Sequence, residues 1–194
     1  MQKTKYAGRV LAALALAVIA ASCTRARITE QYQKDGVEFK YYSDWKVTKD
    51  APVAGKANVR AINIEGPEHA VVALICVPPA SAQTLDQFAA AVADRRVEAI
   101  EARLSVGSIK TAEVSKGTSE PTTAAVAGQE RRGILQHFSI DLLGVQVPHE
   151  ARFYVVQGSR YKIMVMYQVA TSHAETTHPG SELILSTLTI EGLS

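Results

Sequence analysis

The chain has 194 residues, of which 47% are hydrophobic and 21% are charged, with 21 Lys and Arg against 19 Asp and Glu. This length is enough for one domain with a substantial hydrophobic core. The basic residues are not gathered into one patch, so the composition argues against a nucleic-acid-binding protein.

The N-terminus has the layout of an export signal. Lys3, Lys5 and Arg9 precede an unbroken apolar run over residues 10–21. A membrane-spanning helix needs roughly 20 apolar residues, so this shorter run favours a secretory signal peptide over residues 1–22. Cleavage removes the three basic residues and leaves 18 basic against 19 acidic residues, a balance of −1.

The signal ends in small residues directly before Cys23. This ending resembles the lipobox of bacterial lipoproteins, which implies cleavage before Cys23 and lipid attachment to its sulfur. Several acyl chains make such an anchor durable. The next residue is Thr24 rather than the Asp that retains enteric-type lipoproteins at the inner membrane. The resemblance therefore implies a periplasm-facing envelope protein, with the outer membrane favoured. The alternatives are a secreted protein with an incidental cysteine and an uncleaved membrane anchor.

Residues 23–35 are polar and charged. They predict a lipidated, flexible tether in front of a single domain over residues 36–194. The alternation of Val37, Phe39 and Tyr41 predicts a half-buried strand at the start of this domain. The strands predicted next are 45–48, 59–64 and 70–77, with a loop over 50–56.

The longest helix is predicted to begin after Thr84. Gln87 stands three residues later and completes a capping box, and apolar residues recur at helical spacing from Leu85 to Leu104. Beyond the helix, strands are predicted at 109–116, 130–142, 147–157 and 160–169, with a loop over 117–128. A final helix is predicted from residues 177–179, with Pro179 at an early position.

The segments 70–77 and 160–169 are apolar on both faces. Strands of this kind require cover on both sides, so the sequence predicts an α+β fold. In it, an antiparallel sheet is flanked by the long helix on one face and the C-terminal helix on the other.

Several packing motifs resemble the PsbP/Mog1-like superfamily, which includes DcrB-type bacterial proteins. The motifs are the strand pair over residues 36–45, the helix start at 84–88, the hairpin over 151–163 and the closing helix at 183–188. They span most of residues 36–190. The resemblance implies an α/β/α sandwich and a non-enzymatic role as an assembly factor, accessory subunit or binding adaptor, although a fold does not by itself fix a function.

Catalytic motifs are missing from the sequence. There is no nucleophile elbow, phosphate-binding loop or dinucleotide fingerprint. Cys76 lies in an apolar run and is interpreted as a small core residue. We therefore expect no enzymatic activity, no cofactor and no metal. The pair Asp141 and Glu150 is interpreted as surface residues rather than catalytic carboxylates.

Two residue pairs that contain histidine are weak candidates for a ligand or metal site. They are His149 with Glu150, and His173 with His178, whose spacing does not fit a zinc-binding helix. The basic pairs at 95–96 and 131–132 are interpreted as solvated, with binding of an anionic headgroup or a peptidoglycan carboxylate as the alternative.

Tyr41, Tyr42 and Trp45 form the main aromatic cluster. Packing at the sheet edge is one interpretation, and a partner surface is the other. The favoured hypothesis is a lipid-tethered envelope protein that binds an unidentified envelope protein. This hypothesis predicts an exposed apolar or aromatic patch on the domain. A periplasmic small-ligand or metal-binding protein and an unrecognised hydrolase are the alternatives.

Overall fold

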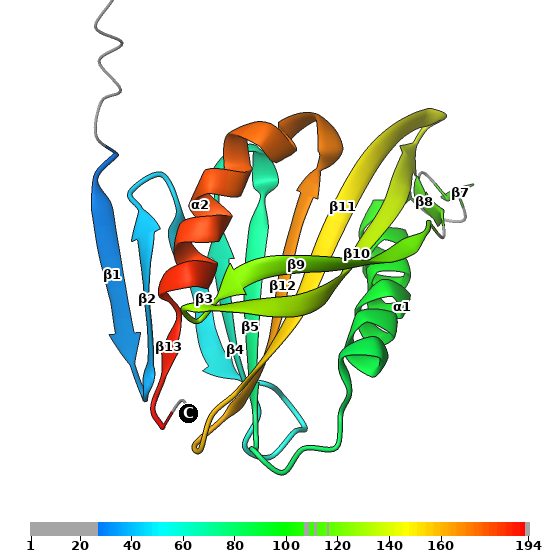
Figure 1. Cartoon of the computed structure of the whole chain (residues 1–194). Helices are drawn as coiled ribbons and strands as arrows, with labels where there is room; N and C mark the ends of the chain where they lie inside the picture. The colour runs from blue at the N-terminus through cyan, green and yellow to red at the C-terminus, as the bar shows by residue number, and fades with distance from the viewer. Residues whose placement is uncertain (1–26, 107–108, 111, 116, 193–194) are drawn as a thin grey trace, which may run out of the picture.

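The computed structural model describes residues 27–106, 109–110, 112–115 and 117–192. Within them lie a large antiparallel sheet, a small three-stranded sheet and two α-helices (Figure 1). The helices are α1 (Leu85–Leu104) and α2 (Ala174–Thr187), with 3-10 turns at Pro67–His69 and Thr171–His173. The strands are β1 (Thr29–Lys34), β2 (Val37–Tyr42), β3 (Lys46–Pro52), β4 (Arg60–Glu65), β5 (Val71–Val77), β6 (Ser105–Val106), β7 (Ile109–Lys110), β8 (Ala112–Ser115), β9 (Ser119–Val126), β10 (Gln129–Leu142), β11 (Val145–Gln157), β12 (Lys162–Ala170) and β13 (Thr189–Ile190).

The large sheet has the strand order β3-β4-β5-β12-β11-β10-β8, and β9 pairs with the first half of β10. The small sheet has the order β1-β2-β13, and β6 pairs with β7. All of these pairings are antiparallel. The sheet is therefore built from hairpins and from long-range pairing of β5 with β12.

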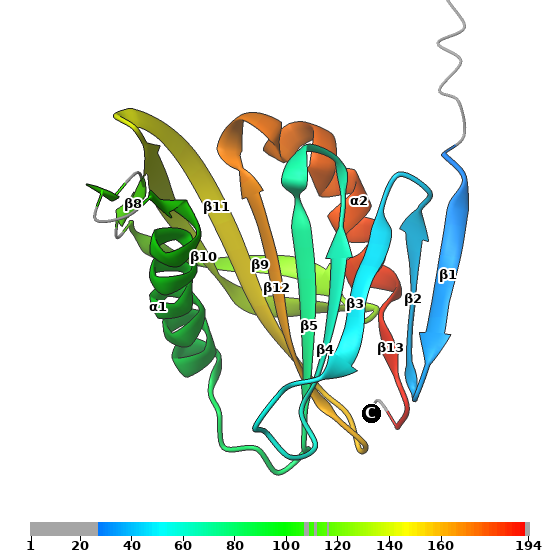
Figure 2. The same ribbon diagram turned by 180° about the vertical axis from the view of Figure 1, so that it is seen from behind.

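The two helices lie on opposite faces of the large sheet. Helix α2 packs with β2, β9 and β12 on the face nearer the viewer in Figure 1, and α1 packs against β8, β10 and β11 on the other (Figure 2). This arrangement confirms the predicted α+β fold. The small sheet adds a further layer on the α2 face, because Val37 and Phe39 of β2 are fully buried in the same core as Ile184.

The alternation of side chains explains the two cores. In β12, Ile163, Val165 and Tyr167 enter the core beneath α2, whereas Met164 joins the core beneath α1. Successive side chains of a strand point to opposite faces, so a central strand needs apolar residues at every position. The prediction that this strand is covered on both sides is confirmed.

The predicted capping box begins α1. The Thr84 amide donates to Gln87 Oε1 at 3.0 Å, and the Gln87 amide donates to Thr84 Oγ1 at 3.2 Å. These two bonds satisfy amides that have no partner inside the helix. The start of α1 is therefore set by local sequence.

Trp45 is only 3% exposed and anchors α2 to the rest of the domain. A methyl group on Gly180 would lie 2.1 Å from the Trp45 indole Nε1, and one on Gly66 would lie 2.5 Å from the ring. Both distances are far below van der Waals contact. The two glycines therefore allow the indole to lie between α2 and the β4–β5 connection.

The prediction of a tether over residues 23–35 is wrong for its second half. Residues 29–34 form β1, which pairs with β2 along its whole length. A polar network also joins β1 to the large sheet: Arg60 Nε donates to Asp50 Oδ1 at 2.6 Å, and Tyr32 Oη donates to Asp50 Oδ2 at 2.9 Å. Lys34 Nζ lies 2.6 Å from the same carboxylate. The polar composition reflects an edge strand, not a flexible linker.

Three smaller predictions are also corrected. The predicted loop over 117–128 contains β9, whose alternate residues turn inward up to the buried Val126. Strand β3 continues to Pro52, into the predicted loop over 50–56. Helix α2 begins at Ala174, so Pro179 lies inside it rather than near its first position.

Candidate functional site

A hollow of about 370 Å³ lies between α2, β9, β11 and β12. Its walls combine the apolar residues Ala124, Ala125 and Leu185 with polar, charged and aromatic side chains, which are Thr123, Arg152, Tyr154, Tyr167, His178, Ser181, Glu182 and Ser186. This volume falls within the range of small-molecule sites. We call it the α2 pocket.

A buried carboxylate connects β11 to α2 beside the α2 pocket. Glu150 is 6% exposed, and its Oε1 lies 2.8 Å from His178 Nε2 and accepts a hydrogen bond of 3.1 Å from Arg152 Nε. Glu150 and Arg152 are two residues apart on a strand, which places both on the same face. Since both contacts are made to the same oxygen, Oε1, they fix the three side chains relative to one another.

Two tyrosines complete the inner wall of the α2 pocket. Tyr167 Oη and Thr177 Oγ1 are 2.7 Å apart, and the Tyr167 ring lies edge-on to the His178 imidazole with centroids 5.6 Å apart. The Tyr154 hydroxyl is buried without a hydrogen-bond partner in the described part of the chain. Burial raises the pKa of both phenols, so both stay protonated. The α2 pocket is therefore lined on this side by two neutral phenols.

Among the described residues that line the α2 pocket, Ser181 is the one buried serine, and its hydroxyl is bonded to the backbone rather than to the His178 imidazole. Ser181 is 2% exposed, and its Oγ donates to the backbone carbonyl of His178 at 2.9 Å. The imidazole Nε2 is already bonded to Glu150. This geometry differs from that of a nucleophile activated by a base.

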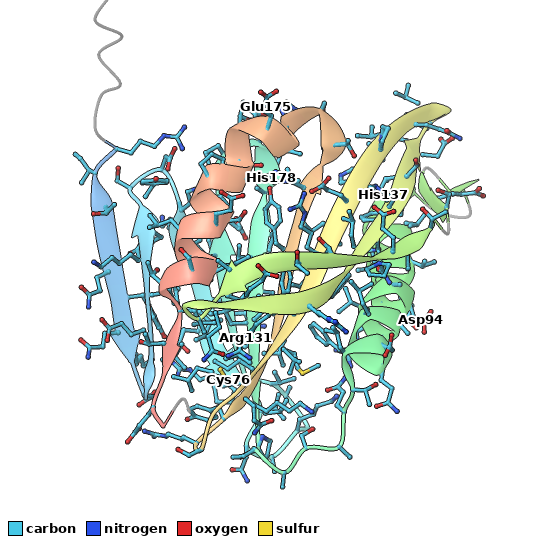
Figure 3. The ribbon with its side chains drawn as sticks, viewed as in Figure 1. Cys76, Asp94, Arg131, His137, Glu175 and His178 are labelled. Atoms are coloured by element: carbon cyan, nitrogen blue, oxygen red, sulfur yellow. The ribbon has the colours of Figure 1, made fainter. Side chains whose placement is uncertain are left out.

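In each of the two candidate pairs, the two residues contact different partners. His149 stacks on Phe138, with ring centroids 5.3 Å apart, while its neighbour Glu150 contacts His178 instead. His173 lies 3.7 Å from Glu68, and His137 lies at β10, away from His178 on α2 (Figure 3). One residue of each candidate pair, Glu150 and His178, thus meets the other beside the α2 pocket. Within the described residues no group of three metal-ligating side chains is present.

The interpretation of Glu150 as a surface residue is wrong, because only 6% of it is exposed. Glu150 lies opposite His137 across the β10–β11 ladder, whereas Asp141 lies opposite Gln146 near the hairpin end. Periodicity alone suggested no site here, because the rest of β11 is strongly apolar. The signal available in the sequence was the charged pair of Glu150 and Arg152, two residues apart in that apolar strand.

A second hollow, of about 250 Å³, lies between α1 and β10 and is lined by Arg96, Gln136 and Phe138. Arg96 is 9% exposed, so its interpretation as a solvated residue is wrong, although Arg95 is exposed. The Arg96 guanidinium carbon lies 3.7 Å above the Phe138 ring, and its Nε donates to Gln168 at 3.0 Å. Burial lowers the pKa of this guanidinium to about 10.

The basic pair at 131–132 belongs to the start of β10. Arg131 Nε donates to the Val126 carbonyl at 3.1 Å, across the β9–β10 turn, and Arg132 is exposed. Arg131 is labelled in Figure 3 at this end of the β9–β10 ribbon. The pair does not line either hollow described above.

The aromatic cluster predicted as a partner surface is divided by the fold. Trp45 is buried between the two glycines described above and cannot contribute to an exposed surface. Tyr41 and Tyr42 are partly exposed on β2, and the Arg27 guanidinium lies 5.2 Å from the centre of the Tyr42 ring. A partner surface formed by the two tyrosines stays a prediction.

The structure describes one of the two cysteines, Cys76. Cys76 is fully buried in β5, and burial raises the pKa of its thiol to about 11, the opposite of an activated thiol. Cys23 and the signal over 1–22 lie outside the described residues. In the described part of the chain, neither helix is both long and apolar enough to cross a membrane.

No protein-family model and no curated protein matches the chain. Among solved structures, it is similar to cyanobacterial PsbP (CyanoP) from Synechocystis sp. PCC 6803, with 15% identity and a TM-score of 0.47 over 88% of this chain and 98% of that one. LpqN of Mycobacterium tuberculosis, described as involved in cell envelope biogenesis, matches with 10% identity and a TM-score of 0.37 over 86% of this chain and 92% of LpqN. Likenesses at this level assign no activity or partner to the chain.

Proposed function

We propose that the chain is a lipid-anchored, periplasm-facing lipoprotein of a bacterial envelope whose domain acts as a non-enzymatic binding module for another envelope protein. The observation that carries the binding role is the α2 pocket. Arg152 and His178 line this hollow of about 370 Å³, and both are bonded to the buried Glu150 beside it. A pocket with preorganised polar groups suits recognition of one projecting polar group.

A non-enzymatic role is supported by the state of the nucleophiles that the structure describes near the core. The Ser181 hydroxyl donates to a backbone carbonyl, and the Cys76 thiol is buried with a raised pKa. Neither group has the neighbouring base or accessible position that covalent catalysis requires. The α2 pocket thus offers positioning groups without an activated attacking atom.

The anchor rests on the sequence. The basic start, the apolar run over 10–21 and the small residues before Cys23 imply export and lipid attachment. Thr24 favours the outer over the inner membrane. The test is to express the full chain in a Gram-negative host with labelled palmitate, beside a Cys23→Ala variant. We expect label and membrane association in the wild type and neither in the variant. Equal behaviour of the two proteins would reject the anchor.

The pocket is tested by photo-crosslinking in the same membranes. A photoreactive residue replaces Ser186, which lines the α2 pocket, and the control carries it at Thr176, which is exposed on the same helix outside the pocket. We expect a discrete protein adduct from position 186 alone, and its loss on Arg152→Ala. Adducts of equal yield from both positions would contradict recognition by the pocket.

A second candidate is binding of a small polar ligand, favoured by the convergence of Arg152, Tyr154 and His178 on one hollow. A ligand small enough to enter this hollow can form hydrogen bonds with these side chains. This candidate predicts no protein adduct from position 186. It predicts instead a thermal stabilisation by the ligand that is lost in Tyr154→Phe.

A further inference from the structure

The hairpin of β10 and β11 ends in an apolar tip formed by Leu142, Leu143 and Val145. Their exposed fractions are 39%, 81% and 64%. In the described part of the chain, the remaining exposed large hydrophobic residue is Ile28, at 71%. Exposed single apolar side chains are common, but a cluster of three at one projecting turn indicates contact with an apolar surface.

The backbone of this tip is strained by its sequence. Leu142 pairs with Val145, so Leu143 and Gly144 form a two-residue turn with φ angles of 55° and 86°. Positive φ at both positions is the pattern of a type I′ turn, in which Asn or Asp is favoured before Gly. Leucine seldom adopts positive φ. The turn is supported by the Gly144 amide, which donates to Asp141 Oδ1 at 2.7 Å.

A leucine at this position therefore has two costs: an unfavourable backbone conformation and an apolar side chain in water. Positive φ also occurs at Ala127 in the β9–β10 turn, so at Leu143 it is the exposed apolar side chain that distinguishes the tip. The same sequence position would accept asparagine with lower strain and full hydration. An apolar tip with these two costs indicates that its side chains contact an apolar surface.

The tip and the start of β1 lie at the same end of the molecule, which is the upper end in both Figure 1 and Figure 2. Ile28 precedes β1 directly. Only five peptide steps separate Cys23 from Ile28, a reach of at most roughly 17 Å. If Cys23 carries lipid, this end of the domain is held close to the bilayer and faces it.

The size of the patch favours lipid over protein as the occupant. A stable protein interface buries about 800 Å² per partner, far more than three side chains at a turn provide. A short apolar projection can instead enter the interfacial region of a bilayer, as other interfacial anchors do. Its neighbour Asp141 is only partly buried and can remain hydrated at the surface.

We propose that Leu142, Leu143 and Val145 insert into the same membrane leaflet that holds the lipid on Cys23. This inference rests on the proposed lipid anchor and deepens it. Two contacts at one end of the domain fix its orientation, whereas a tether alone allows it to rotate freely. The connection between β3 and β4, at the opposite end in Figure 1, then points away from the membrane.

The test uses the full lipidated protein reconstituted in vesicles of phosphatidylethanolamine and phosphatidylglycerol that contain bromine-labelled acyl chains. An environment-sensitive fluorophore is attached to a cysteine replacing Gln146, beside the tip, and in a control to one replacing Lys56, in the β3–β4 connection. Both positions are exposed. We expect blue-shifted, quenched emission at position 146 and neither effect at position 56.

The decisive variant is Leu143→Asn, which suits a type I′ turn and therefore keeps the hairpin folded. It removes the most exposed leucine and should weaken tip insertion about 10-fold, with a matching loss of quenching. Palmitate label without quenching at position 146 would overturn membrane insertion and leave the anchor intact. Absence of label overturns the anchor and the insertion with it. A protein crosslink from position 146 in place of lipid quenching would assign the tip to a protein partner and overturn the proposal.

Discussion

The two faces of the large sheet are covered in different ways. On one face, α2, the small sheet and β9 together enclose a core in which Tyr154, Tyr167 and Phe39 are at most 1% exposed. On the other face, the core beneath α1 leaves Ile75 and Met166 only partly buried. The same strands supply both faces. The difference therefore comes from the covering elements and not from the sheet.

The buried charged side chains follow the same division. Beneath α2, the buried carboxylate of Glu150 has two cationic or imidazole partners. Beneath α1, Arg96 is buried over an aromatic ring, and its Nη2 has no hydrogen-bond partner in the described residues. Buried charges are tolerated best when they are paired. We therefore expect the α2 face to carry most of the stability and the α1 face to be the more deformable.

The largest expected effect is on the free energy of unfolding, and it is tested by replacing one leucine on each helix. Leu185 of α2 is 3% exposed, whereas Leu85 of α1 is half-buried. Leu185→Ala should lower the free energy of unfolding by about 2–5 kcal/mol because it opens a cavity in a closed core. Leu85→Ala should cost about 1 kcal/mol, since less area is lost. Urea unfolding measures both, and equal losses would contradict the contrast.

An intermediate effect is expected where the small sheet is attached. Hydrogen bonds from Arg60, opposed by partial burial, hold the pKa of the Asp50 carboxyl well below its usual range. Asp50→Asn should cost about 2 kcal/mol at neutral pH, because Arg60 loses its partner. The exposed Asp44 provides a matched control, and Asp44→Asn should change little.

The pH dependence of the same pair has a defined sign. The carboxyl pKa is lower in the folded than in the unfolded state, so its contribution is complete above the ordinary Asp pKa of about 3.9. It is lost as the pH falls from there toward the folded-state pKa. The difference in stability between wild type and Asp50→Asn should therefore shrink below about pH 4. A difference that grows on acidification would reject this role for Asp50.

The smallest expected effect is at the start of α1. Thr84→Ala removes the hydroxyl that accepts the Gln87 amide and should cost about 1 kcal/mol. Thr118 is exposed in a connecting segment, and Thr118→Ala serves as the control. Amide hydrogen exchange should show faster opening of the first turn of α1 with little change in α2. Comparable loss of protection in both helices would mean that the two faces unfold together.

Features that depend on near neighbours in the chain were accessible from the sequence. The capping box of Thr84 and Gln87, the doubly apolar β12 and the alternation in β2 are set by local periodicity and turn chemistry. These signals act over a few residues and need no knowledge of the fold. They were sufficient for the α+β architecture and the order of its main elements.

Features that depend on distant segments were decided by tertiary structure alone. The polar β1 is a strand because β2 supplies backbone partners and Asp50 binds its Tyr32 and Lys34 side chains. Trp45 is buried because Gly180 leaves space for it. The contact beside the α2 pocket exists because α2 brings His178 to Glu150, 28 residues earlier in the chain. Periodicity reports which face a side chain takes, but only packing determines what stands opposite that face.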